Sequence, residues 1–560
     1  MSRIYTHPTM AKVDVPNIDL LTLLFDSEHA VSLPDSVLHV DAKLPHNRLT
    51  KAMLRDLTQR VAHGLRENYG IGSSGPSKDV VTVISHGDYI LSGVFFGILG
   101  AGGVYSAASP SSTVSELARQ IKLGKSNLVV CDRDHVDVVS KAAAQCKLPE
   151  RNILVLESSP WSLKSLDGSI DGISTKTLPW QRITDPKALK ESLIVILWSS
   201  GTTGLPKGVM ISHRNLVAES WILSLGPRKW VEEQVAAGTF TPIENRSIAH
   251  LPTSHIAGLF GYFISPVFSS GTLYWMRKYN WKDMLNYAAK YKITTLYTVP
   301  SIYLRISKSS DVTDQFASLA AANTGAAPMD GDLQKAANDR LGDGKVHMLG
   351  QTWGLSETTG AVTAVPPGEP DDTGSIGSIL PSVELRLVDE DFKDVEPGQE
   401  GELVLKSPVV TNGYYDNPQA TKDSFHDGWF LTGDIGVLRN GKFYVVDRKK
   451  ELLKYKGLQV APAEIEGLLF AHPLIKEAAV VGLPDPSAGD LPRAYVVPEE
   501  KGRISEDDVK KYVASKLAAH KQLRGGVVFV DEIPKSAIGK LLRRELRERA
   551  KREVKLGAKL

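Results

Sequence analysis

The stretch Leu193-Ile194-Val195-Ile196-Leu197-Trp198-Ser199-Ser200-Gly201-Thr202-Thr203-Gly204-Leu205-Pro206-Lys207-Gly208 joins an apolar run to a run of small residues. The apolar run predicts a strand buried on both faces. The loop after it leaves backbone N–H groups and hydroxyls free to surround an anion, and Lys207 adds a positive charge. A Walker A loop needs Gly before the Lys and Ser or Thr after it, whereas Pro206 and Gly208 stand here. The stretch therefore predicts phosphate binding by a different architecture.

Further apolar runs alternate with helical patterns through most of the chain. Runs that are apolar throughout predict strands of a parallel sheet, and their alternation with helices predicts a layered α/β fold. The predicted strands include Val80–Ile84, Leu128–Cys131, Ile153–Leu156 and Ile293–Tyr297, and the predicted helices include Leu49–Asn68 and Val114–Leu123.

The pattern changes from about residue 375, where apolar and polar residues alternate. Val383–Val388, Gly401–Leu405 and Gly441–Val446 predict antiparallel strands of a distorted β-barrel. The charged run that starts at Asp447 is typical of an exposed hinge, so we place a domain boundary there. We expect a large N-terminal domain of α/β subdomains plus the barrel over residues 1–446, and a small mobile α+β domain over residues 447–560.

Composition excludes several classes of protein. The chain has 560 residues, of which 42% are hydrophobic and 23% charged, as in ordinary globular domains. Its two cysteines, Cys131 and Cys146, are too few for a disulfide framework or a cysteine-built metal site. The formal net charge of +2 gives no reason to expect nucleic-acid binding. Residues 501–560, however, hold 17 Lys and Arg against 8 Asp and Glu, and such a basic segment could meet nucleic acid, a membrane or a polyanionic small molecule.

Two segments bear on location. Residues 89–115 carry no charge, but five glycines and Pro110 interrupt them, which predicts a buried helix and strand rather than a transmembrane segment. The N-terminus lacks the apolar core of a secretory signal. Ala558-Lys559-Leu560 is a conservative variant of the Ser-Lys-Leu peroxisomal address, so we expect binding to the peroxisomal import receptor, with the cytosol as the alternative.

Seven motifs along nearly the whole chain resemble, in order, those of the adenylate-forming enzymes. This superfamily includes acyl-CoA synthetases, 4-coumarate–CoA ligases, beetle luciferases and the adenylation domains of peptide synthetases. The motifs are Ser199–Gly208, His250–Gly258, Gly325–Pro328, Gln351–Glu357, Leu431–Asp434, Asp447–Gly457 and Pro534–Lys540.

The resemblance implies an ATP-dependent acid–CoA ligase, most similar to 4-coumarate–CoA ligase-like enzymes. A small-molecule carboxylic acid would attack the α-phosphate of ATP, expel pyrophosphate and form an acyl-adenylate, from which the thiol of coenzyme A displaces AMP. The alternatives are an enzyme that loads a carrier-protein thiol, a luciferase-like monooxygenase and a non-catalytic nucleotide-binding scaffold. Intact Glu357, Asp434, Arg448 and Lys540 argue against the scaffold.

The resemblance also implies catalytic roles. Glu357 would hold Mg²⁺, Ser356 would donate its hydroxyl to the α-phosphate, and Lys540 would swing onto that phosphate from the mobile domain. His255 would line the entrance for the acid and the thiol. Thr352 and Trp353 replace the Gly and Tyr usual at these positions, so the adenine pocket is less well defined.

The remaining implied residues bind nucleotide, coenzyme A or acid. Asp434 would accept the ribose hydroxyls and Asp447 would be the hinge. Lys450 and Lys454 would face AMP, while Lys456 and Gly457 would lie along the coenzyme A tunnel in a second conformation. The implied nucleotide and coenzyme A set is Ser199, Ser200, Gly201, Thr202, Thr203, Gly204, Lys207, Gly325, Ala326, Ala327, Gln351, Thr352, Trp353, Gly354, Asp434, Arg448, Lys450, Lys454, Lys456 and Gly457.

The acid pocket would begin just after His255. Its implied residues are His255, Ala257, Gly258, Phe260, Gly261 and Phe263. Ala257 and Gly261 fall where the 4-coumarate ligases place polar side chains, and neither can hydrogen-bond a phenol. The sequence therefore favours a less hydroxylated aryl acid or an acyl chain at least as much as a phenolic acid, and it does not identify the acid.

Overall fold

The structure is a computed structural model. It describes residues 3–199, 206–327, 329–342, 349–369, 371–456, 458–485, 488–535 and 541–557.

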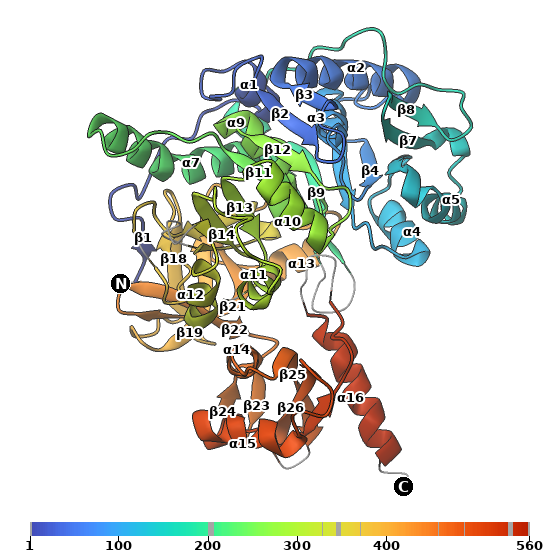
Figure 1. Ribbon diagram of the computed structural model, residues 1–560. Helices are drawn as coiled ribbons and strands as arrows, with labels where there is room; N and C mark the ends of the chain where they lie inside the picture. The colour runs from blue at the N-terminus through green and yellow to red at the C-terminus, as the bar shows by residue number, and fades with distance from the viewer. Residues whose placement is uncertain are drawn as a thin grey trace.

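A seven-stranded sheet forms the centre of the first part of the chain (Figure 1). Its order is β10-β9-β5-β4-β6-β7-β8, parallel from β9 to β7 and antiparallel at both edges. All residues of β4, β5 and β6 are buried, as expected for strands covered on both faces. The strands are β4 (Val80–Ile84), β5 (Val104–Ala108), β6 (Leu128–Asp132), β7 (Ile153–Ser158), β8 (Trp161–Ser165), β9 (Leu193–Ser199) and β10 (Lys207–Ser212).

The uncharged stretch after Tyr89 forms a buried helix, α3 (Leu91–Gly100), followed by β5, as predicted. Helix α3 packs against α2 (Lys51–Tyr69), where a Cβ added at Gly93 or Gly97 would lie 2.4 Å from Leu57 or Val61. The two helices can therefore approach this closely only with glycine at these positions. Within the described residues, no helix is long and apolar enough to cross a membrane.

Helix boundaries follow local capping. Helix α2 begins at Lys51, later than the predicted Leu49, because the Thr50 hydroxyl caps it and Leu49 belongs to β3. Other helices of this part are α1 (Leu20–Phe25), α4 (Val114–Leu123), α5 (Val136–Gln145), α6 (Pro186–Glu191) and α7 (His213–Ala236), with short 3₁₀ turns η1 (Arg133–His135) and η2 (Glu150–Asn152).

Two further sheets complete the α/β part. One has the order β11-β12-β2-β3 and the other β13-β14-β15-β16-β17. Strand β13 begins two residues later than predicted, because the Ile293 N–H donates to Ala288 O at the end of α10. The strands are β2 (Val37–Asp41), β3 (Arg48–Thr50), β11 (Arg246–Ala249), β12 (Thr272–Trp275), β13 (Thr295–Thr298), β14 (Ala321–Thr324), β15 (Leu349–Leu355), β16 (Gly360–Ala364) and β17 (Ser378–Ile379).

Short helices connect these strands. They are α8 (Ile256–Leu259), the π-helical turn η3 (Phe260–Ile264), α9 (Ser265–Ser269), α10 (Trp281–Lys290), α11 (Pro300–Lys308), α12 (Gly331–Asn338) and the 3₁₀ turn η5 (Ser356–Thr358).

The predicted barrel region is an antiparallel sheet with the order β1-β18-β19-β21-β20, and β22 pairs with β21. Its strands are β1 (Tyr5–Thr6), β18 (Glu384–Val388), β19 (Glu400–Lys406), β20 (Phe425–His426), β21 (Trp429–Arg439) and β22 (Lys442–Arg448), with helix α13 (Pro418–Asp423) between β19 and β20.

A separate unit follows β22 and lies below the rest of the molecule in Figure 1. Its sheet has the order β24-β23-β26-β25, with β27 on β26, and it contains its own apolar cores. The Lys308 ammonium of α11 donates to Ile475 O over 2.9 Å and ties this unit to the large part. The elements are β23 (Leu453–Tyr455), β24 (Leu458–Val460), α14 (Pro462–Phe470), β25 (Ile475–Asp485), β26 (Gly489–Pro498), α15 (Glu506–Lys516), η6 (Ala519–Lys521), β27 (Val527–Phe529) and α16 (Arg543–Gly557).

Candidate active site

A cavity of about 2360 Å³ lies where the sheets of the large part meet the C-terminal unit. Its walls include Ser199 and Lys207 of the β9–β10 hairpin, His255 beside α8, and Arg448 at the end of β22. Sites for single small ligands are typically 300–1,000 Å³. The cavity therefore has room for a nucleotide and a second substrate together.

One end of the cavity gathers groups suited to phosphate and a cation. The Glu357 carboxylate of η5 is 9% exposed, and its Oε1 accepts hydrogen bonds from the hydroxyls of Tyr414 (3.0 Å) and Ser199 (3.4 Å). The Lys207 ammonium lies 5.1 Å from the centre of the Tyr414 ring. Lys207 pairs with Ser199 across the hairpin, so strand pairing sets their separation.

Tyr414 is a site residue that sequence reasoning missed. Burial and the neighbouring Glu357 charge raise the pKa of Tyr414, so its hydroxyl stays protonated and donates to the carboxylate. Its position is set by a β-bridge to Val209, which lies 205 residues earlier in the chain. No residue pattern around Gly413-Tyr414 marks such a long-range contact, and only the resemblance to a family could have carried the signal.

Asp434 is held between two donors on neighbouring strands. Its Oδ2 accepts the Trp353 indole N–H over 2.9 Å, and its Oδ1 lies 3.2 Å from the Arg448 guanidinium Nε. Arg448 stands directly opposite Asp434 in the pairing of β21 with β22. Asp434 is 4% exposed and fixed in one orientation; it does not itself line the cavity, but its neighbours Gly433 and Arg448 do.

The start of the C-terminal unit contributes cations to the same edge. Lys449 donates to Glu402 Oε2 over 2.9 Å, while burial lowers the pKa of Lys450, which also faces the charges of Arg448, Asp434 and Glu357. Among the described residues of the 535–547 segment, Lys535, Leu541 and Arg543 line the cavity.

Asp447 joins the two parts. In the pairing of β21 with β22 it stands opposite Ile435. Its carboxylate accepts the N–H groups of Arg448 (2.7 Å) and Ala463 (3.0 Å), the latter in the first turn of α14. Burial raises the pKa of Asp447, with Arg543 opposing this.

The predicted acid pocket is only partly on the cavity wall. His255 caps α8, its Nδ1 accepting the Ala257 N–H over 3.3 Å, and His255, Ala257, Phe260 and Gly261 line the cavity. Gly258 instead packs on the backbone: an added Cβ would lie 2.3 Å from Pro252 O. Phe263 is fully buried, packing on Phe95 and Trp275. The structure thus places these two residues in the core behind the pocket.

The predicted adenine side divides in the same way. Ala326, Thr352, Gly354 and Ser356 line the cavity. Gln351 is buried and holds both the N–H and the carbonyl of Met329, so it shapes the wall from behind. Trp353 is buried, its indole N–H bound to Asp434, and it belongs to the main apolar core. The substitution at position 353 therefore acts on the ribose-side carboxylate.

Several predicted residues are elsewhere. Lys454 and Lys456 do not line the cavity; the Lys456 ammonium lies 5.7 Å from the centre of the Tyr455 ring. Ser200, Gly201, Thr202, Thr203, Gly204, Gly457, Lys540 and the terminal Ala558-Lys559-Leu560 lie outside the described residues.

Glu219 of α7 is a second residue that sequence reasoning missed. It borders the cavity and is 1% exposed. Its Oε1 accepts the Ala361 N–H over 2.8 Å, whereas Oε2 is buried without a hydrogen-bond partner among the described residues. Burial raises the pKa of Glu219 well above its ordinary value.

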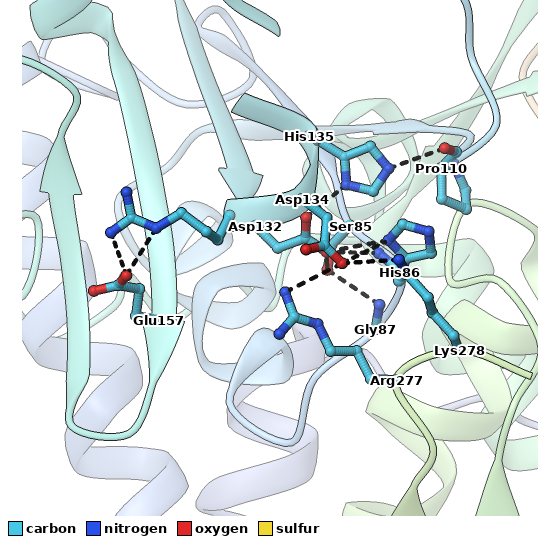
Figure 2. A network of polar contacts seen from close by, with 11 residues as sticks. Ser85, His86, Gly87, Pro110, Asp132, Asp134, His135, Glu157, Arg277 and Lys278 are labelled. Atoms are coloured by element: carbon cyan, nitrogen blue, oxygen red, sulfur yellow. Dashed lines mark hydrogen bonds and ion pairs between the residues drawn. The ribbon is translucent and has the colours of Figure 1, made fainter. Parts of the chain in front are cut away.

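Outside this cavity, a polar network joins the ends of β4 and β6 (Figure 2). The His135 ring meets Asp132 Oδ1 through Nδ1 (2.6 Å) and Pro110 O through Nε2 (2.9 Å). Both partners only accept, so His135 is doubly protonated and charged. Asp132 Oδ2 accepts the backbone N–H of His86 over 2.9 Å.

The two imidazoles and the Asp132 carboxylate lie close enough to hold a metal ion. However, both nitrogens of His135 are already engaged, and the Lys278 ammonium lies 3.1 Å from Asp134 beside the group. These contacts argue against a metal ion here, and the network fastens two neighbouring strands of the sheet.

Comparison with known proteins agrees with this geometry. The AMP-binding enzyme family model matches residues 27–415, and the model of the AMP-binding enzyme C-terminal domain matches residues 464–540. An Emericella nidulans protein named as an acyl-coenzyme A synthetase is 47% identical over 98% of both chains. An Aspergillus niger phenylacetyl-CoA ligase is 33% identical over 97% of this chain and 98% of its own.

Among solved structures, ATP-bound MatB from Rhodopseudomonas palustris superposes with a TM-score of 0.78 at 28% identity, covering 95% of this chain and 98% of its own. The chain thus belongs to the AMP-binding enzyme family. The predicted fold class, and the predicted class of AMP-forming acid–CoA ligase with an acyl-adenylate intermediate, are confirmed.

Proposed function

We propose that this protein is an ATP- and Mg²⁺-dependent ligase that joins a small-molecule carboxylic acid to coenzyme A. The observation that carries the proposal is one continuous cavity that Glu357, Lys207, His255 and Ala257 all line. Arg448, the partner of Asp434, also lines it at the end of β22, just before the C-terminal unit. This set of groups suits a nucleotide with its phosphates toward Glu357 and an acid near the α-phosphate.

The residues present fit a magnesium ion. Glu357 offers a carboxylate, which is the hard oxygen ligand that Mg²⁺ prefers, and Tyr414 engages only Oε1. Mg²⁺ usually keeps several waters and binds through one or two carboxylates plus substrate phosphates, so a single protein carboxylate suffices. The ion would neutralise phosphate charge, and Glu357 would hold it in place.

The chemistry proceeds in two displacements. An oxygen of the substrate carboxylate attacks the α-phosphorus while the bond to pyrophosphate breaks, giving acyl-AMP. The coenzyme A thiolate then attacks the acyl carbon, and AMP leaves with its electron pair on phosphate. Lys207 and Lys450 supply positive charge along the phosphates, and Ser356 supplies a hydroxyl donor. Phosphoryl transfer depends mainly on such positioning and charge.

The two displacements use two positions of the C-terminal unit. In the present structure Lys535 and Leu541, which flank Lys540, line the cavity, while Lys454 and Lys456 do not. This arrangement supports a role for Lys540 in adenylation. Rotation about Asp447 would bring Lys456 and Gly457 to the cavity for thioester formation, a hinge motion that serves each step in turn.

The test is AMP release from ATP, Mg²⁺ and a panel of aryl, medium-chain and long-chain acids, with and without coenzyme A. We expect release to depend on coenzyme A and to match acyl-CoA formation. Glu357→Gln should abolish most of this activity, whereas Glu150→Gln, at an exposed glutamate away from the cavity, should not. Acyl transfer only to a carrier-protein thiol, or oxygen consumption with light emission, would favour the alternative enzymes.

We also propose import into peroxisomes through Ala558-Lys559-Leu560, which combines small, basic and Leu residues in the order that the import receptor reads. A fluorescent fusion that carries these residues at its C-terminus should be punctate, and removing them should make it diffuse. Diffuse signal from the intact fusion would refute the address.

A further inference from the structure

Helix α7 presents one face to the cavity over three turns. Glu219, Leu223, Gly226 and Trp230 line the cavity, with the spacing of four, three and four residues that places side chains on a single helical face. At 1.5 Å per residue the stripe from Glu219 to Trp230 is about 16 Å long. The cavity thus continues well beyond the phosphate end as a groove along α7, the helix that extends outward in green in Figure 1.

The stripe on α7 and the predicted acid pocket line one and the same cavity. Glu219 borders it together with Ala257 and Gly261. Burial raises the pKa of the Glu219 carboxyl well above its ordinary value, and the described residues place no ion-pair partner beside it. Burial thus favours the uncharged form of this carboxyl, beside which an alkyl chain can lie.

The outer part of the groove is apolar and opens to the surface. Trp230 contacts Phe240 edge-on with ring centres 5.1 Å apart, and it packs so closely on Gly368 that a Cβ there would lie 2.7 Å from its Nε1. Pro366 and Pro367 form part of the facing wall. Ile243, beside Phe240 in the lining, is 54% exposed, which marks the open end.

Gly226 leaves the middle of the groove open. A Cβ added there would find no heavy atom within 4 Å, although α7 is otherwise half-buried along this stretch. Glycine is unfavourable inside a helix, and here its lack of a Cβ also relieves the clash with the ring of the following Pro227. Its effect is to leave room beside Leu223 and Trp230.

We propose that the groove along α7 holds the alkyl tail of the substrate, so that the acid is a medium- to long-chain fatty acid rather than a compact aryl acid, with Gly226 setting the permitted length. The proposal rests on the proposed ligase function and names its substrate class. Each methylene that leaves water for an apolar wall strengthens binding by up to about fourfold. The apolar length beyond the acid pocket thus favours long tails over short ones.

The experiment measures kcat/KM for coenzyme A-dependent AMP release with hexanoate, decanoate, myristate and phenylacetate. Wild type should prefer myristate to hexanoate by at least tenfold. Gly226→Leu should lower the value for myristate by tenfold or more and leave that for hexanoate within about twofold. Glu232→Leu places the same side chain at an exposed position of the same helix, away from the lining, and should change neither value.

Three results would overturn the proposal. Wild type could prefer phenylacetate or hexanoate to myristate, Gly226→Leu could affect all acids equally, or it could raise the KM for coenzyme A, which would assign the groove to the thiol arm. Binding of the same acids by calorimetry, in the presence of a non-hydrolysable ATP analogue, gives the chain-length contrast without turnover. Failure of AMP release with every acid would instead contradict the ligase function.

Discussion

The indole N–H of Trp353 donates to Asp434 Oδ2 over 2.9 Å, joining strand β15 to strand β21 beneath the cavity. This contact leaves the Asp434 carboxylate with one oxygen toward Trp353 and the other toward Arg448. The orientation of the Asp434 carboxylate, which we expect to accept the ribose hydroxyls, is therefore set by a residue that does not itself line the cavity.

Replacing Trp353 with Phe keeps an aromatic ring in the core but removes the donor. We expect the KM for ATP to rise by about 10- to 100-fold, because a hydrogen bond to a charged acceptor is worth about 1.5–3 kcal/mol. The KM for the acid should change little. Steady-state kinetics with each substrate varied in turn test this, and an equal rise in both KM values would contradict it.

Replacing Tyr414 with Phe removes one hydroxyl donor from Glu357. We expect pyrophosphate exchange to need more Mg²⁺ and to slow by about 10- to 100-fold, since hydrogen bonds to charged groups are worth about 1.5–3 kcal/mol. The matched control is Tyr415→Phe, because Tyr415 packs its ring against the Val80 and Ile196 core instead. If the Mg²⁺ dependence of Tyr414→Phe were the same as that of wild type, Tyr414 would have no role in positioning Glu357 for the metal ion.

The two half-reactions should respond oppositely to two lysine substitutions. Lys540→Ala should slow acyl-adenylate formation by about 10²–10³-fold, the usual cost of losing one charge contact in a transition state. It should spare thioester formation from preformed acyl-AMP. Lys456→Ala should do the reverse. Equal losses in both half-reactions would rule out separate roles for the two residues.

The Asp132–His135 pair predicts a pH dependence of stability. Burial lowers the pKa of His135, but its hydrogen bond to Asp132 outweighs this and raises the net pKa. Burial raises the pKa of Asp132, but bonds from His135 and His86 outweigh it, so the net pKa is lowered. The ion pair therefore stabilises the fold at pH values that lie between the pKa of Asp132 and the pKa of His135 in the folded protein. It is fully formed between about pH 4 and pH 6.5, the ordinary values of the two groups.

Asp132→Asn should lower the free energy of unfolding by about 3 kcal/mol near pH 5.5, as breaking one partner of a buried ion pair does. The difference from wild type should shrink as the pH rises through the raised pKa of His135 and the ring loses its proton. Thermal unfolding midpoints across this range provide the measurement. A pH-independent difference would mean that His135 is neutral in the folded protein.

The sequence predicted those parts of the site that a short segment defines. The strand before Ser199, the loop with Lys207 and the Ser356-Glu357 pair are each contiguous, and the structure brings their described residues to one cavity. It did not predict Tyr414 or Glu219, because each is placed by a contact with a distant segment. Tyr414 forms a β-bridge with Val209, and Glu219 accepts a hydrogen bond from the Ala361 N–H. Phe263 was expected on the wall, but aromatic packing with Phe95 and Trp275 holds it in the core.

Asp447 is bound on both sides of the predicted hinge. It pairs with β21 as part of β22, and its carboxylate accepts a hydrogen bond from Ala463 in the first turn of α14. If the C-terminal unit rotates about Asp447, the hydrogen bond to Ala463 must either move with the unit or break. If the Asp447 carboxylate keeps this bond and moves with the unit, the rotation must take place earlier in the chain, within β22. Hydrogen bonds between β22 and β21 would then break. If the bond between Asp447 and Ala463 breaks instead, the Asp447 carboxylate would have to form new hydrogen bonds, with water or with other groups in the second position. If Asp447 is the hinge, the strength of its hydrogen bond to Ala463 would set how long the C-terminal unit stays in each of its two positions.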